Sequence, residues 1–207
     1  MNIFMLRSKP HNIERLPLFL EKNLVAIGWH ATGDLTGKTM DQVKEILHDE
    51  YGYEGQSLRT NLGTVKTFLN TKEGDLILIR EKDNNDYVHI GKINGSYEWK
   101  PEYLDLFMPH TKSISWLVAV SYDSLNASIQ TMLKNPRTTC KYPGSYEESE
   151  LDQIINVSTK NSENKINSNQ QQVIDDMLEI LRNLANNAEN EQVRLDAAKE
   201  LLNHLRK

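Results

Sequence analysis

The sequence has very little cysteine and no long apolar run, and each absence limits what the protein can be. Cys140 is the single cysteine among 207 residues, which excludes an internal disulfide and a cysteine-rich zinc site. No apolar stretch reaches the length of a membrane span, and the N-terminus is too short and too polar for a signal peptide. We therefore expect a soluble cytoplasmic protein with no membrane partner.

Positive charge is also scarce. The chain has 24 Lys and Arg against 29 Asp and Glu, which gives a formal net charge of −5. A protein that coats nucleic acid or anionic lipid through bulk charge needs the opposite balance. Only a local basic groove remains available for a nucleic acid.

Catalytic motifs are missing as well. The sequence contains neither a GxxxxGK[ST] phosphate loop nor a GxSxG nucleophile elbow. Asp75, Glu81 and Lys92 loosely resemble the spaced acidic residues and lysine of restriction-type nucleases, but a plain turn followed by a strand is strongly favoured as their explanation. We predict a non-catalytic protein with no cofactor and no metal site. The histidines show no metal-ligand spacing; they are His11, His30, His48, His89, His110 and His204.

Hydrophobic periodicity predicts one α+β domain over residues 1–156. Its sheet is small and largely antiparallel, and a compact, partly closed β-barrel is the expected form. Thr39 is a candidate helix N-cap, and residues 83–86 form a candidate hairpin turn. The predicted strands are 2–6, 24–28, 75–81, 86–95 and 114–121, and the predicted helices are 12–23, 40–50, 57–70, 123–134 and 147–156.

The C-terminal quarter of the chain has a different composition. Residues 157–169 are rich in Asn, Ser and Lys, and predict a flexible linker. Residues 170–207 are strongly helical, and the step Asn186-Asn187 indicates two antiparallel helices, with one long helix as the alternative. A segment of this length cannot bury its own apolar stripes, so we expect these helices to pair with copies of this chain or to pack on another protein.

Several stretches resemble the PUA-like group of β-barrel domains, which includes the EVE and YTH readers. They are FMLRSKPH, AIGWHATGDLTG, KEGDLILIRE, HIGKINGSYEW and PHTKSISWL, within residues 1–140. The motifs GW-x-x-x-GDL and IG-x-I-x-G-x-Y carry most of the resemblance, which is closest to versions found beside restriction and phage-defence nucleases. It implies a nucleic-acid surface that holds an extruded, often methylated base in an aromatic pocket.

Candidate ligand-binding residues follow from that resemblance, each beside a structural alternative. Trp29 is either a pocket wall or a core residue that closes the barrel end, and Trp116 is favoured as core. Tyr97 and Trp99 alternate on one strand and share a face. His30 and Asp34 either read a base edge or cap a polar turn, and His110 precedes a buried strand.

Candidate phosphate-binding residues are basic side chains near these aromatics. Arg7 and Lys9 follow the first strand, Arg59 lies on a helix, and Lys112 precedes a strand. Arg137 and Lys141 offer a second basic edge.

The sequence thus predicts a non-catalytic module for nucleic acid with a flipped or modified base, in a restriction, phage-defence or anti-defence setting. The alternative is a factor that binds a free or signalling nucleotide, or a partner protein, through the same pocket.

Overall fold

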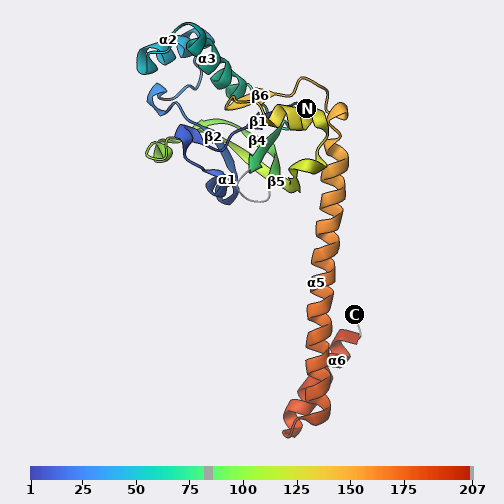
Figure 1. The fold of residues 1–207 in the computed structure, drawn as a ribbon. Coiled ribbons are helices and arrows are strands. Elements are labelled where there is room, and N and C mark those ends of the chain that lie inside the picture. The colour runs from blue at the N-terminus through green and yellow to red at the C-terminus, as the bar shows by residue number, and fades with distance from the viewer. Residues whose placement is uncertain (82–85, 206–207) are drawn as a thin grey trace. The chain divides into compact units, whose positions relative to one another are not determined.

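The computed structural model of the chain describes the backbone of residues 1–81 and 86–205, and the side chains of these residues except 158–171 and 204–205. Three of the four residues of the predicted turn at 83–86 lie outside this description. The chain divides into two compact units, Met1–Asn156 and Val157–Lys207. Figure 1 shows their elements, and each unit is described by itself.

The first unit is a mixed α/β domain around one six-stranded sheet with the order β2-β5-β4-β3-β1-β6. β1 and β3 are parallel, and the other neighbours are antiparallel. This order leaves β2 and β6 as two edges, so the ladder is open where a partly closed barrel was predicted. The strands are β1 (Ile3–Leu6), β2 (Leu24–Ile27), β3 (Leu76–Glu81), β4 (Tyr87–Trp99), β5 (His110–Ser121) and β6 (Thr139–Lys141).

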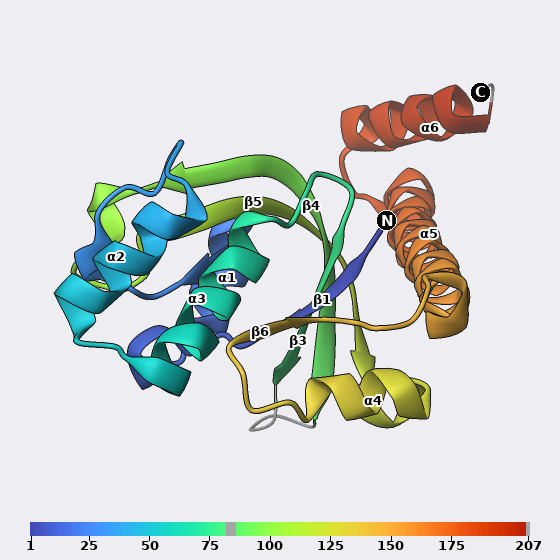
Figure 2. The same cartoon turned by 90° about the horizontal axis from the view of Figure 1, so that it is seen from above.

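The two longest strands give the sheet its curvature. β4 and β5 pair along most of their length, with register shifts between Ile90 and Gly91 and between Ile93 and Tyr97. Such irregularities bend a strand pair, and Figure 2 shows both strands curving. A Cβ on Gly91 would lie 2.6 Å from the Ile114 side chain and 2.9 Å from the Trp116 ring, so this bend needs glycine.

Helices cover both faces of the sheet. α1, α2 and α3 lie on one face and α4 on the other (Figure 2). Because strand side chains alternate, Phe4 and Leu6 of β1 join the α1–α3 core, and Ile3 and Met5 join the α4 core. The helices of this unit are α1 (Leu16–Lys22), α2 (Met40–Tyr51), α3 (Gly55–Leu69) and α4 (Ala127–Leu133), with 3-10 turns at Pro10–Asn12, His30–Thr32, Pro101–Tyr103, Tyr122–Ser124 and Glu147–Ser149.

Helix starts show where local rules held. The predicted cap at Thr39 is confirmed, since its hydroxyl accepts from the Gln42 N–H and the Gln42 side chain accepts from the Thr39 N–H. A helix beginning at Asn12 is wrong, because Asn12 has a φ of +61° and α1 begins only at Leu16. Strand β6 lies between the predicted helices 123–134 and 147–156, where the sequence predicts no strand.

The remaining helices are α5 (Leu151–Asn187) and α6 (Glu191–Leu205). The backbone of 157–169 is helical, where the sequence predicts a flexible linker. Asn and Ser made this stretch resemble a linker, but it contains neither Gly nor Pro to interrupt a helix. The break between α5 and α6 follows Asn187. Among the described residues, no helix combines the length and hydropathy needed to span a bilayer.

Candidate functional site

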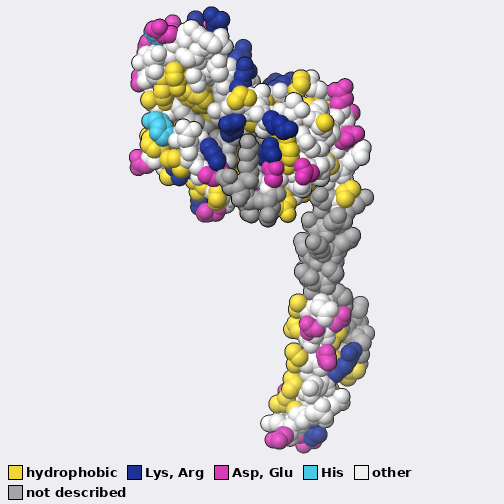
Figure 3. All heavy atoms as spheres, viewed as in Figure 1, with side chains coloured by type: hydrophobic (Ala, Val, Ile, Leu, Met, Phe, Trp, Pro, Cys, Tyr) yellow, Lys and Arg dark blue, Asp and Glu magenta, His cyan; other side chains and the backbone are white. Residues whose placement is uncertain are grey.

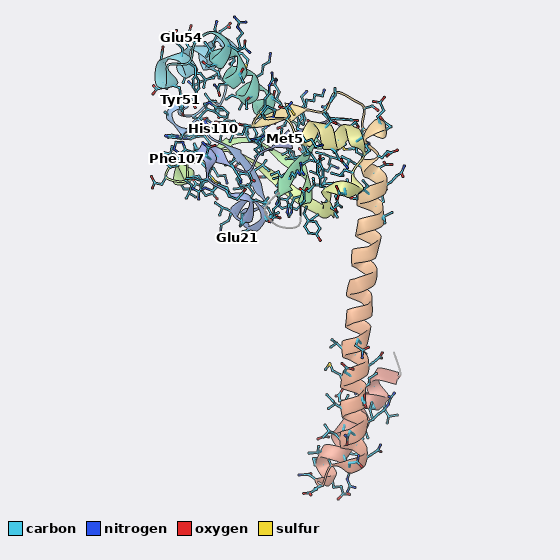
Figure 4. All side chains as sticks on the ribbon, in the orientation of Figure 1. Met5, Glu21, Tyr51, Glu54, Phe107 and His110 are labelled. Atoms are coloured by element: carbon cyan, nitrogen blue, oxygen red, sulfur yellow. The ribbon has the colours of Figure 1, made fainter. Side chains whose placement is uncertain are left out.

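A hollow of about 240 Å³ lies at the end of β2, and its lining is mostly aromatic. We name it the aromatic pocket. Figure 4 labels Tyr51, at the end of α2, and Phe107, which precedes β5, at the same end of the domain. The ring-bearing residues that line it are His11, Trp29, His30, Tyr51, Tyr53 and Phe107, and Lys9, Asn12 and Thr138 are among the others.

The rings form two stacked groups from segments far apart in the sequence. His11 stacks on Phe107 with ring centroids 4.3 Å apart, and His30 meets Phe107 edge-on at 4.9 Å. Tyr51 stacks on Tyr53 at 5.3 Å, and the Ala31 N–H donates to the Tyr51 hydroxyl at 2.9 Å. Both groups line the same small hollow, so a flat ligand there would meet ring faces and edges.

The backbone around the aromatic pocket is strained. Of seven non-glycine residues with positive φ among those described, four line this hollow: His11, Asn12, Trp29 and Phe107. Asn and His adopt this conformation fairly readily, but Trp and Phe rarely do. Each such residue costs about 1–3 kcal/mol unless its surroundings hold it, and such residues cluster at functional sites.

A buried polar layer beneath the aromatic pocket holds Trp29 in place. The Trp29 carbonyl accepts from the Thr32 hydroxyl at 2.8 Å and from His110 Nε2 at 3.1 Å. The Tyr97 hydroxyl donates to His110 Nδ1 at 2.8 Å and accepts from the Leu35 N–H at 3.2 Å. A neutral His110 protonated on Nε2 satisfies every bond of this set.

Electrostatics keep this layer uncharged. His110 has no exposed surface, and burial lowers its pKa to about 4. Burial also raises the pKa of Tyr97 to about 12. The sequence predicts that Tyr97 and His110 contact the ligand, but neither residue lines the aromatic pocket. The structure makes them positioning residues that fix the Trp29 turn.

The other predicted aromatic and acidic residues divide in the same way. Trp29 and His30 line the aromatic pocket. Asp34 is exposed on the following turn, where Thr36 donates from its backbone N–H and its hydroxyl; these bonds lower the Asp34 pKa. Trp99 meets His110 edge-on at 4.9 Å, away from the hollow. Trp116 is half-buried against the α1–α3 core, and its Nε1 donates to the Phe19 carbonyl at 3.2 Å.

The predicted phosphate-binding residues do not converge. Lys9 lines the aromatic pocket and pairs with Glu14 at 3.5 Å, and Arg7 lines an adjoining hollow. Arg59 is exposed on α3 and lines neither. Lys112 is only 2% exposed, and its ammonium donates to the carbonyls of Leu69 and Thr71. Lys112 therefore closes the end of α3 and presents no charge to a phosphate.

Sequence reasoning missed His11, Tyr51, Tyr53 and Phe107. Two signals were present. The tyrosines stand on either side of Gly52 directly after a helix, and His11 follows Pro10 where an apolar strand has ended. What the sequence lacked was any sign that residues 11 and 107 would meet.

The nuclease-like set is not assembled. Asp75 is 4% exposed and accepts from the backbone N–H groups of Asn2 and Lys72, so it fastens the N-terminus. Glu81 lies at the other end of β3, about 20 Å away at strand spacing, and pairs with His89. Among the described residues, no group of His, Cys, Asp and Glu is arranged to hold a metal ion.

Fold and site together define a mixed α/β domain with an aromatic pocket at the sheet end. The chain belongs to the family described as a domain of unknown function, DUF8426, whose model matches residues 14–141. That match includes the pocket residues from Gly28 to Thr138 and omits Lys9 to Asn12. No curated protein matches the chain.

Among solved structures, the chain is similar to the YTH domain of the Zygosaccharomyces rouxii MRB1 protein in complex with N6-methyladenosine RNA. The two are 13% identical with a TM-score of 0.41, over 74% of this chain and 86% of the other. A likeness this low supports no conclusion about ligand or function.

Proposed function

We propose that the first unit is a non-catalytic binding module for nucleic acid that holds a flipped or modified base in the aromatic pocket. One observation carries the proposal: rings from four separate segments line a single hollow of about 240 Å³. This lies just below the roughly 300–1,000 Å³ of pockets for drug-sized ligands, which suits one ring system.

The energetics of base capture favour such a site. Extruding a base from a stack costs a few kcal/mol. Stacking on an aromatic side chain returns about 1–3 kcal/mol for each base. His11, His30 and Asn12 add polar atoms at the wall for the edge of the base, and a methyl group would add apolar contact with Phe107.

Strain at the aromatic pocket supports a binding role over a packing role. A core needs neither Trp29 nor Phe107 in a left-handed conformation, because rings pack well from ordinary strands and helices. The buried layer under Trp29 holds one of these conformations in place before a ligand arrives. Preorganisation of this kind lowers the ordering cost of binding.

Tryptophan fluorescence tests the proposal, because Trp29 lines the aromatic pocket whereas Trp116 packs on the α1–α3 core. Mononucleotides and short oligonucleotides, with and without methylated bases, are titrated into Trp116→Phe and Trp29→Phe proteins. We expect quenching by oligonucleotides in Trp116→Phe and its loss in Trp29→Phe. Equal quenching in both variants would reject the pocket. Quenching by free nucleotides alone would replace this function with nucleotide binding.

We also propose the setting and assembly that follow from the sequence. The setting is restriction, phage defence or anti-defence. The assembly is a homo-oligomer through the second unit, whose α5 exposes Val173, Met177 and Ile180 to 57–61% and Leu184 to 40% at heptad spacing. Sedimentation of Met177→Asp beside Glu179→Asp tests this: only the former should shift the protein to monomer, and an unchanged mass would reject it.

A further inference from the structure

Two further hollows lie along residues 135–141, and the first of them adjoins the aromatic pocket. The first, of about 330 Å³, shares Lys9, Asn12 and Thr138 with the aromatic pocket. The second, of about 520 Å³, lies among α3, α4 and β6. From this segment, Pro136 and Thr138 line the first hollow. Asn135, Arg137 and residues 139–141 line the second. We name the two together the β6 groove.

Charge is strongly segregated along this path. Five basic residues line the aromatic pocket and the β6 groove: Arg7, Lys9, Arg80, Arg137 and Lys141. Among the described residues, the one carboxylate that lines them is Glu14. Figure 3 shows Lys and Arg side chains gathered around β6. A chain of net charge −5 thus concentrates positive potential beside the pocket.

The hollow along α2, the helix that ends at the aromatic pocket, carries the other sign. α2 ends at Tyr51, and the hollow between α2 and α3 is lined by Asp41, Glu45 and Asp49 with Lys44. Phosphates are repelled there. A charged strand that enters the aromatic pocket therefore has one favourable exit, over the β6 groove.

The basic side chains differ in how they are held. The Arg80 guanidinium donates two hydrogen bonds of 2.6 Å to the Asp86 carboxylate. The same guanidinium stacks on the Tyr122 ring. Arg7 donates to the Asn135 carbonyl at 3.0 Å, while Arg137 and Lys141 are exposed. From Thr138 to Lys141 the strand extends about 10 Å, which is room for one or two phosphates beyond the base.

Resting on the proposed function, we infer that the ligand is a single-stranded nucleic acid whose backbone leaves the aromatic pocket in one direction only. Arg7, Arg137 and Lys141 contact its phosphates. The second hollow, of about 520 Å³ between α3 and α4, takes up one backbone on this inference. Arg137 and Lys141, on the second hollow, then determine how affinity depends on strand length and polarity.

The test uses the full-length protein and labelled single strands that carry the preferred base at the 5′ end, the centre or the 3′ end. Fluorescence anisotropy gives affinities at several salt concentrations. The variant Arg137→Gln/Lys141→Gln is compared with Lys44→Gln/Lys92→Gln, which removes the same charge from exposed positions outside the groove. His11→Asn removes a pocket ring with a residue that tolerates the same backbone.

We expect nucleotides added on one side of the base to raise affinity and those on the other side to have no effect. The groove variant should lose about five- to tenfold in affinity at low salt, since each exposed ion pair contributes up to about 1 kcal/mol. Its salt slope should fall by about 1.4, at about 0.7 per single-strand phosphate contact. The control variant should change neither quantity beyond a small common offset.

Three results separate the possibilities. Equal gains on both sides, equal effects of both double variants, or preference for duplex would overturn the one-directional single strand while leaving the base site intact. If the groove variant loses affinity and His11→Asn does not, phosphate binding in the β6 groove is supported and base capture in the aromatic pocket is rejected. Loss in both, with gain on one side only, supports both.

Discussion

The rim of the aromatic pocket and the polar layer beneath it contrast within one end of the domain. The rim is built from two ring pairs: His11 and Phe107 meet only through the fold, whereas Tyr51 and Tyr53 are neighbours in the sequence. The layer is built from His110 and Tyr97, which are fully satisfied by protein partners. Two residues predicted to bind the ligand, Tyr97 and His110, instead hold the site from below, and residues that the sequence did not single out line it beside Trp29 and His30.

The largest expected effect comes from breaking the layer. His110→Ala removes the partner of Tyr97 and of the Trp29 carbonyl and leaves a cavity. We expect the free energy of unfolding to fall by about 2–4 kcal/mol, measured by urea denaturation. The exposed His48→Ala is the control and should change it by less than about 1 kcal/mol. A similar loss in both variants would mean that the layer has no special role.

Acid should act on the same layer. His110 has an ordinary pKa of 6.5 and a folded pKa of about 4, so the neutral ring is favoured by folding. The contribution of His110 to the free energy of unfolding is fully present above pH 6.5. It is lost as the pH falls towards 4, by up to about 3 kcal/mol, because the unfolded chain binds the proton first. Denaturation midpoints from pH 7 to 4 measure this. His110→Gln should flatten the curve, and an unflattened curve would assign the acid effect elsewhere.

Lys112 should act with the same sign in an alkaline range. Burial lowers its pKa from 10.5 to about 8, so the unfolded chain binds more protons between these values. Stability from this residue should therefore rise from pH 8 to 10.5. Lys112→Met should remove that rise, and denaturation midpoints in this range would show whether it does.

The two regions also differ in how well sequence alone describes them. Regular periodicity predicted the strands and helices that frame the site, including the cap at Thr39. Trp29 was predicted as a pocket wall through the resemblance to PUA-like readers, with a core position as the alternative. Lys112 was misjudged because a lysine on a strand is usually exposed, and only the fold places the end of α3 beside it.

The rim was out of reach for a physical reason. His11 and Phe107 are held in left-handed conformations, which no local propensity favours for Phe, and they are separated by nearly half the chain. The prediction of a linker at residues 157–169 was wrong for a different reason. Its composition resembles a linker, but no residue in it breaks a helix, and the backbone there is part of α5. Sequence patterns report local preference, and the failure at the rim depends on what surrounds its segments.

A change to the framework tests whether the bend of the sheet supports the site. Gly91→Ala places a Cβ against Ile114 and Trp116 and should lower the free energy of unfolding by about 1–3 kcal/mol. Thermal denaturation measures it, and Gly63→Ala on α3, where a Cβ meets nothing within 4 Å, is the control. Stability unchanged in Gly91→Ala would show that the curvature tolerates a side chain here.

Substitution of a ring at the rim should change stability least, although we expect it to change binding strongly. Tyr53→Leu removes one ring of the Tyr51 stack, and Tyr87→Leu removes an exposed ring on β4 that lies outside the aromatic pocket. Tyr87→Leu should keep the free energy of unfolding within about 0.5 kcal/mol of the parent, as surface changes usually do, and Tyr53→Leu, at a half-buried ring, should lower it by no more than about 1 kcal/mol. Differential scanning calorimetry of the two variants checks this, and a large loss in Tyr53→Leu alone would make the ring a core residue.

The most direct measurement of the central claim is the affinity of these two variants for short single strands that carry a methylated base. If the aromatic pocket captures a base, Tyr53→Leu should bind about tenfold more weakly, from the roughly 1–3 kcal/mol of one stacking contact, and Tyr87→Leu should bind like the parent. Parent-like affinity in a folded Tyr53→Leu protein would contradict the account.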